Sequence, residues 1–165
     1  MQVNAILAAI PDQVQHKNGK IFSLCAKQTV TKAFFFDIVD VGLYYPDCTS
    51  NRSIFDEQNK LLRFSYLREV TGKQFKEGAE EFLQKNLSQE QQQHCLASYQ
   101  EINESYLDVQ EGDFYDLFQI DEIGLDLYLN GQSLASLDSK SCESLYFNIW
   151  FGEESMSADF SKLLK

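Results

Sequence analysis

The sequence contains few of the residues on which metal binding and covalent chemistry depend. Its 165 residues include only four cysteines, two histidines and two prolines. No two cysteines form a C-x-x-C pair, and with His16 and His94 as the only imidazoles a zinc site of recognisable spacing is absent. No apolar run approaches the 18 residues that a membrane-spanning helix needs. The sequence therefore predicts no metal site, no cofactor and no transmembrane segment.

Motifs for nucleotide binding and hydrolysis are missing as well. The sequence has no P-loop, no G-x-G-x-x-G, no H-E-x-x-H and no G-x-S-x-G. A Ser-His-acid triad would need one of the two histidines. His94 lies in the polar segment QEQQQHC and is interpreted as solvated, and His16 lies in an N-terminal segment that we expect to be mobile. The acidic run DEIGLD, residues 121–126, is interpreted as a solvated edge.

The four cysteines are far apart in the sequence. We expect them to be buried free thiols, and a disulfide remains open if the protein is exported. The start, MQVNAILAAIPDQV, has no basic residue before its short apolar run and is no export signal as it stands. The location stays open: periplasmic if an export signal has been removed, and cytoplasmic otherwise.

Composition and charge favour one soluble globular domain over residues 1–165, with residues 1–19 as its N-terminal segment. A chain of this length buries roughly 70% of its unfolded surface, so it needs no metal or disulfide to form a core. The formal net charge is −11. Such a charge repels phosphate backbones and anionic lipid surfaces, so nucleic acid is not an expected partner.

The hydrophobic pattern predicts an α+β fold with one large antiparallel sheet and helices packed on one face. Aromatic and β-branched segments indicate strands, and Asn130-Gly131 predicts a hairpin turn. The expected strands are 20–27, 33–45, 61–68, 113–122 and the two arms of the hairpin at 124–137. The expected helices are 71–86, a second one from Ser88, 139–151 and 157–164.

The helix expected at 71–86 has one apolar face. Phe75, Ala79, Phe82 and Leu83 follow the i, i+4, i+7, i+8 spacing of such a face. Thr71 with Gln74, and Ser88 with Gln91, have the spacing of capping boxes. The second helix is expected to direct four apolar side chains toward the core, namely Leu96, Tyr99, Ile102 and Tyr106.

The order of these segments resembles the chalcone isomerase family. FFFDIVDVGLYYPD (34–47) resembles its strand ending in Gly-Leu/Val-Tyr-Leu, and TGKQFKEGAEEFLQKN (71–86) resembles its first helix. Residues 122–164 resemble the closing hairpin and helices of bacterial chalcone isomerase-like proteins, with Ile149-Trp150-Phe151-Gly152 as the most specific part. The resemblance covers residues 20 to 164 and implies an open-faced β-sandwich.

The resemblance also implies where a catalytic site would lie, and the required side chains are missing there. True chalcone isomerases stabilise negative charge on a ketone oxygen with hydrogen-bond donors, without a cofactor. The family's tyrosine and asparagine fall at Phe75 and Phe82, its strand threonine at Val39 and its late hydroxyl at Ile149. None of these four side chains can donate a hydrogen bond, so we expect apolar lining and no catalytic residues.

The family's arginine falls at Lys27 in an ungapped alignment, or at Thr31 if it is aligned with the bacterial Gly-x-Gly-x-Arg pattern, which is itself missing here. The ungapped alignment implies that Lys27 lies on the cleft side of the first strand, where a lysine could bind a carboxylate as a single point charge. Lys32, Arg63 and Arg68 are other candidate cations, each interpreted as a surface charge.

Three functional hypotheses follow from the resemblance. The first is a non-enzymatic protein that binds a fatty acid or another apolar small ligand between the sheet and the first helix, with Lys27, Val39, Phe75, Phe82 and Ile149 at the site. The second is a structural or interaction protein whose cleft is filled by these side chains. The third is an enzyme with an unrecognised site, built from residues such as Tyr44, Tyr45 or Tyr66. A cavity of several hundred Å³ would favour the first over the second.

Overall fold

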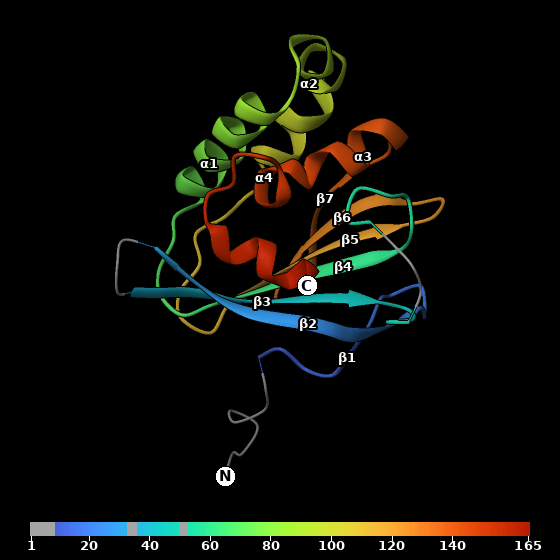
Figure 1. Ribbon diagram of the computed structural model, residues 1–165, viewed down its shortest axis with the longest axis vertical. Coiled ribbons are helices and arrows are strands. Elements are labelled where there is room, and N and C mark those ends of the chain that lie inside the picture. The colour runs from blue at the N-terminus through green and yellow to red at the C-terminus, as the bar shows by residue number, and fades with distance from the viewer. Residues whose placement is uncertain (1–8, 33–35, 50–52) are drawn as a thin grey trace.

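The computed structural model, which describes residues 9–32, 36–49 and 53–165, contains one antiparallel sheet of seven strands (Figure 1). Every strand pairs with its neighbours in the chain, so strand order follows sequence order. The strands are β1 Gln13–Gln15, β2 Ile21–Lys32, β3 Phe36–Tyr45, β4 Lys60–Tyr66, β5 Phe114–Ile120, β6 Gly124–Leu129 and β7 Gln132–Leu137. Residues 33–35, which the sequence analysis assigned to a strand, lie outside the described residues.

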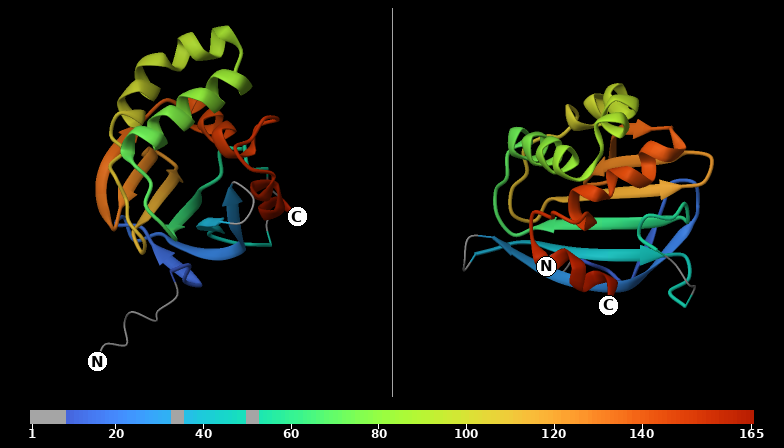
Figure 2. Two further views of the ribbon diagram at one scale, coloured as in Figure 1. Left: turned by 90° about the vertical axis from the view of Figure 1, so that its left-hand side faces the viewer. Right: turned by 45° about the horizontal axis from the view of Figure 1, so that its top comes forward.

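The helices lie over one face of the curled sheet (Figure 2). They are α1 Gly72–Asn86, α2 Gln89–Asn103, α3 Lys140–Tyr146 and α4 Asn148–Phe151, followed by the 3₁₀ helix η2 Ala158–Leu164. This arrangement confirms the predicted α+β fold, an antiparallel sheet with helices on one side. The single helix expected at 139–151 is instead two short helices that meet at Phe147. No helix in the described ranges is long and apolar enough to cross a membrane.

Alternation along the strands divides the core into two clusters. The cluster beneath the helices contains Val41, Leu62 and Leu117, all fully buried. The cluster on the other face contains Phe22, Tyr44 and other side chains, covered by the N-terminal segment. Strand β1, which the sequence analysis did not predict, belongs to this covering segment and pairs with β2. The expectation of a mobile segment is therefore wrong for residues 13–15.

Local sequence signals determine the helix starts and the hairpin. Both predicted capping boxes are present, from Thr71 with Gln74 and from Ser88 with Gln91. The hairpin turn is confirmed at Asn130 and Gly131, whose φ angles are 50° and 85°, in the left-handed region that Asn and Gly tolerate.

The inward face of α2 differs from the prediction at Leu96, and Tyr106 lies beyond the end of the helix at Asn103. Tyr99 and Ile102 are buried as expected, together with Cys95. Leu96 is instead 54% exposed. It follows Cys95 by one residue, which is about 100° around a helix of 3.6 residues per turn, so it lies outside the stripe that Cys95, Tyr99 and Ile102 define.

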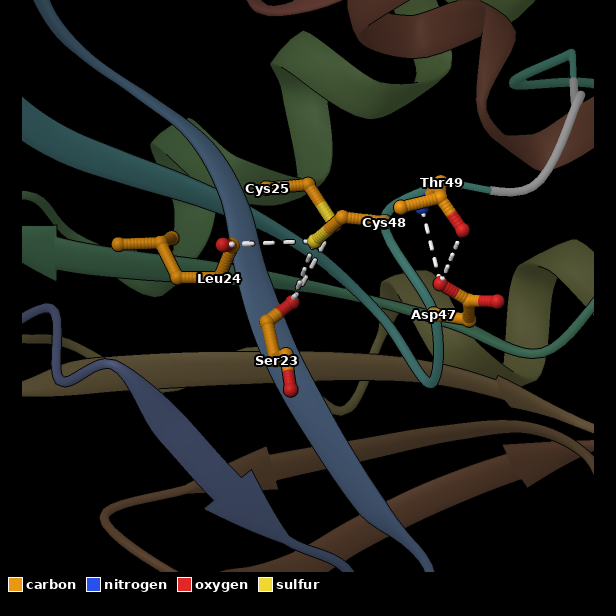
Figure 3. The surroundings of a disulfide bond; sticks show 6 residues. All are labelled: Ser23, Leu24, Cys25, Asp47, Cys48 and Thr49. Atoms are coloured by element: carbon orange, nitrogen blue, oxygen red, sulfur yellow. Dashed lines mark hydrogen bonds between the residues drawn. A yellow bond between two sulfur atoms is a disulfide. The ribbon is translucent and has the colours of Figure 1, made fainter.

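All four cysteines form disulfide bonds, and the expectation of free thiols is wrong. Cys95 and Cys142 link α2 to α3, and Cys25 in β2 is bonded to Cys48 in the loop after β3. Figure 3 shows the second bond beside the carbonyl oxygens of Ser23 and Leu24. Disulfide sulfurs have no hydrogen to donate, so these oxygens make only van der Waals contacts with them.

Candidate functional site

An apolar cavity of about 540 Å³ lies between the helix-covered face of the sheet and α1. Strands β2 to β6 line one side of it, and α1, α4 and η2 contribute most of the other lining residues. The curvature of the sheet holds its central strands away from the helices, and side chains fill the remaining space only in part. This volume lies within the range of about 300–1,000 Å³ that is typical of small-molecule sites.

Four of the five predicted site residues line this cavity. They are Val39 on β3, Phe75 and Phe82 on α1, and Ile149 on α4. The ring of Phe75 is packed against three tyrosine rings, with centroid distances of 5.1 to 5.4 Å. The apolar face of α1 is therefore part of a cavity wall as well as part of the core. Whether these residues contact a ligand remains a proposal.

The fifth predicted residue, Lys27, lies outside the cavity. It pairs with Gly42, on the face of the sheet opposite to the helices, and is exposed beside a separate surface hollow. A β-bulge between Leu24 and Ala26 shifts the register of β2 by one residue. Because side chains alternate between the two faces, such a shift exchanges the faces of all later residues. The expectation that Lys27 lies on the cleft side is therefore wrong.

Thr31, the other position to which the family's arginine could be aligned, does line the cavity. It lies at the rim, where its backbone N–H and its hydroxyl both donate to a carboxylate oxygen of Asp159 at 3.1 and 3.3 Å. These bonds connect β2 to η2 and occupy the position where the family would place its cation. The carboxylate itself is held in its ionised form, since the Thr31 N–H lowers the pKa of Asp159.

The cations suggested by the sequence divide between the two faces. Arg63 lies on the opposite face of the sheet and binds Asp116 through two hydrogen bonds of 2.7 and 2.8 Å. Burial raises the pKa of Asp116 even though Arg63 opposes that shift. Arg68 is exposed at the cavity rim, and the side chain of Lys32 lies outside the described residues.

Charge at the cavity is confined to its rim and is mainly negative. Among the described residues that line the cavity, the charged ones are Arg68, Glu69, Glu77 and Glu81. All four are exposed. Most of the other lining residues are apolar or aromatic, so the cavity is a mainly hydrophobic site whose charged residues are all exposed.

Two tyrosines of the cavity wall have their hydroxyl groups occupied. The hydroxyl groups of Tyr106 and Tyr146 lie 2.9 Å apart, and the Tyr146 hydroxyl donates to Asn103 at 2.7 Å. The Tyr115 hydroxyl donates to the carbonyl oxygen of Leu107 and accepts from its N–H. Burial raises the pKa of Tyr115 to about 12. These hydroxyls connect the loop after α2 to the sheet and stay neutral.

The polar cluster on the opposite face of the sheet is not a catalytic triad. His16 is buried, contrary to the expectation for a mobile terminus, and its Nδ1 accepts a hydrogen bond from the N–H of Asn18. Its Nε2 therefore carries the proton and donates to Asp126 at 3.0 Å. Ser136 donates to the same carboxylate rather than to the imidazole. The histidine has no lone pair left with which to activate a hydroxyl.

The same cluster corrects the interpretation of the run at 121–126 as a solvated edge. Asp126 is 3% exposed, because alternation along β6 directs it toward the N-terminal segment. His94, by contrast, is exposed as expected.

The tyrosines named in the enzymatic hypothesis do not lie together at one site. Tyr44 lies on the face away from the helices, where its hydroxyl donates to the carbonyl oxygen of Pro11, while Tyr66 lines the cavity.

Sequence reasoning missed several lining residues that come from other elements. Phe64 on β4, Trp150 on α4 and Phe160 on η2 all line the cavity, and the rings of Phe64 and Trp150 lie 5.0 Å apart. Alternation along LLRFSYLR could have identified Phe64 and Tyr66 as sharing one face of that strand. No pattern in the sequence shows that a terminal 3₁₀ helix folds back over the sheet.

A curled antiparallel sheet covered by helices on one side, with an apolar cavity between the layers, is an open-faced β-sandwich. The family model described as chalcone isomerase-like matches residues 7–164, and the chain belongs to this family. Among solved structures, the chain is similar to a fatty-acid binding protein of Arabidopsis thaliana, with a TM-score of 0.60 and 13% sequence identity. The match covers 92% of this chain and 95% of that protein, and it shows a shared fold. No curated protein sequence matches the chain.

Proposed function

We propose that this protein binds an apolar small molecule, such as a fatty acid, in the cavity between sheet and α1 and catalyses no reaction there. The observation that carries the proposal is the cavity itself, which has a volume of about 540 Å³ and is lined mainly by apolar and aromatic side chains. The structural neighbour from Arabidopsis is a fatty-acid binding protein, which supplies an analogy at the level of the fold. Together these observations favour binding over a purely structural role.

The cavity argues against the hypothesis of a filled cleft. In that hypothesis Phe75 and Phe82 replace the volume that a ligand would occupy. Instead, Phe75 is packed sideways against its tyrosine neighbours and Phe82 is only half-buried at the wall. Phe75 contacts the sheet through Tyr66 and Tyr115, and the cavity remains open beside these rings.

The chain is expected to give no enzyme-dependent cyclisation of chalcones to flavanones. The positions of the family's donors carry Phe75, Phe82, Val39 and Ile149, and losing one oxyanion donor alone typically lowers the rate by about 10²–10³. The measurement is the loss of chalcone absorbance with and without protein at equal pH. Flavanone formation clearly above the spontaneous rate would overturn the non-enzymatic assignment.

The two disulfide bonds support a location in an oxidising compartment. Disulfides persist in secreted and periplasmic proteins and are rare in the reducing cytosol. Both bonds join elements of the core fold rather than exposed termini. We therefore include an exported, for example periplasmic, location in the proposed function.

Native mass spectrometry of the protein purified from its own source tests the proposal directly, because a retained apolar molecule would add its mass. A matched test uses the neutral fluorescent probe N-phenyl-1-naphthylamine with the variant Val39→Phe. Val39 is 5% exposed and lines the cavity, so a phenyl ring at this position occupies the space of a ligand. The affinity for the probe is expected to fall by about tenfold or more.

The variant Ile21→Phe is the control for this substitution. Ile21 lies on β2, is 50% exposed and does not line the cavity. This variant should bind the probe as the parent does. Thermal melting of both variants checks that they are folded, since an added ring in a packed site can cost about 1–3 kcal/mol. If the parent and Val39→Phe bound the probe with equal affinity, the binding site would lie elsewhere and the proposal that this cavity binds a ligand would be refuted.

A further inference from the structure

The hydroxyl of Tyr66 forms no hydrogen bond with any residue in the described ranges. Tyr66 is 7% exposed and lines the cavity, and its ring is packed edge-on against Phe75 and Tyr115 at 5.3 and 6.2 Å. No described side-chain oxygen or nitrogen is both sealed from solvent and unpartnered. The Tyr66 hydroxyl therefore borders open space, and that space is the cavity.

This free hydroxyl distinguishes Tyr66 from the other tyrosines of the wall. Tyr106 is bonded to Tyr146, and Tyr115 is bonded twice to the backbone of Leu107. A ligand that fills the cavity displaces solvent from this hydroxyl. Leaving the hydroxyl without a partner then costs roughly 1–3 kcal/mol, and a ligand with a polar atom at this position avoids that cost. Tyr66 thus provides an unpartnered polar anchor in a mainly apolar cavity wall.

We infer that the cavity selects apolar molecules with a neutral, hydrogen-bonding head group, such as an alcohol, ester or protonated acid, which the Tyr66 hydroxyl binds, over molecules with an ionised carboxylate. This inference rests on the proposed ligand-binding function and specifies the ligand class for that same cavity.

The electrostatics of the cavity favour a neutral head over an anion. An ionised carboxylate at Tyr66 would lose its hydration and gain one hydrogen bond, with no cation beside it among the residues that line the deep walls. The rim adds three glutamates, Glu69, Glu77 and Glu81, against Arg68. Burial also raises the pKa of Tyr66 well above its ordinary value, so the anchor remains a neutral donor and acceptor at any physiological pH.

The protein contains a built-in probe for the test. Trp150 is the sole tryptophan, it is 8% exposed and it lines the cavity. Its fluorescence therefore reports binding without a label. The experiment titrates the full chain with 1-decanol and with decanoate, which have equal chain lengths, at pH 8 and below their micellar or solubility limits.

The expected result is that decanol binds at least about tenfold more tightly than decanoate at pH 8, and that decanoate binding strengthens as the pH falls to 5, where about half of the acid is neutral. Tyr66→Phe should weaken decanol binding by about fivefold, the value of one hydrogen bond. The matched control Tyr44→Phe, on the opposite face of the sheet, should leave decanol binding unchanged.

Decanoate binding as tight as that of decanol at pH 8 would overturn the inference and leave the proposed function intact. If Tyr66→Phe bound decanol as tightly as the parent does, Tyr66 would not be the anchor, and the proposed function would again stay intact. Binding of neither compound, nor of the naphthylamine probe, would refute the proposed function and the inference together. If Tyr66→Phe does not fold, decanoate binding by the parent tests the inference instead: binding that does not strengthen between pH 8 and pH 5 would overturn it.

Discussion

Raising the pH from 8 to 11 is expected to lower the free energy of unfolding by at least about 4 kcal/mol. The reason is the burial of Tyr66, Tyr106 and Tyr146, which raises the pKa of each above its ordinary value. In the unfolded chain these tyrosines ionise near pH 10, whereas in the fold they stay protonated. Above pH 10 the folded state therefore binds more protons than the unfolded state, and stability falls as the pH rises.

Each of these three tyrosines loses about 1.4 kcal/mol at pH 11, against a typical stability of about 5–15 kcal/mol. Burial also raises the pKa values of Tyr99 and Tyr115, and these two residues add to the loss. Urea unfolding followed by circular dichroism at pH 8, 10 and 11 measures the loss. Tyr66→Phe is the control, because its hydroxyl has no partner in the described protein. This variant should keep the stability at pH 8 and lose about 1.4 kcal/mol less than the parent at pH 11. A midpoint that is constant up to pH 11 would contradict the prediction.

Removing the disulfide bond between α2 and α3 with the double substitution Cys95→Ala and Cys142→Ala is expected to cost about 4 kcal/mol. The two cysteines are separated by 47 residues in the sequence. Removing the bond increases the conformational entropy of the unfolded chain, because the segment between them is no longer closed into a loop. Both cysteines are almost completely buried, so lost packing adds to the effect. Urea unfolding of the variant and the parent at pH 7 measures the difference.

The second disulfide provides the comparison for this prediction. Cys25 and Cys48 are separated by 23 residues and are half-buried, so Cys25→Ala with Cys48→Ala is expected to cost less, about 3.5 kcal/mol. A Cys95/Cys142 variant as stable as the parent would show that the bond does not constrain the chain. If removing the Cys25–Cys48 bond lowered the free energy of unfolding by more than removing the Cys95–Cys142 bond, loop entropy would not determine which disulfide contributes more.

Much of the fold could be predicted because its signals are local. The capping boxes at Thr71 and Ser88 and the turn at Asn130-Gly131 depend on a few consecutive residues. Strand β1 has only three residues, with the sequence QVQ, and is stabilised by its pairing with β2. Such a strand has no pattern of its own that a sequence could reveal.

Residues that line the cavity could be predicted only in segments without a bulge, where positions can be counted along the sequence. Val39, Phe75, Phe82 and Ile149 were assigned from unbroken segments, and they all line the cavity. The assignment of Lys27 failed because the bulge after Leu24 leaves no mark in the sequence. The cysteine pairing was equally inaccessible, since four cysteines allow three pairings and only the folded chain distinguishes them.

The order of the strands also has a consequence for the kinetics of folding. Six consecutive pairings connect the seven strands, and five of them join strands that are separated by 14 residues or fewer in the chain. The pairing of β4 with β5 is different, because helices α1 and α2 lie between these strands in the chain. Local pairings form early at low entropic cost, whereas closing a long segment is slow. The two halves of the sheet can therefore form as separate hairpin units. The cavity is lined by strands of both halves, β2 to β4 and β5 with β6, so it forms only when the two halves join.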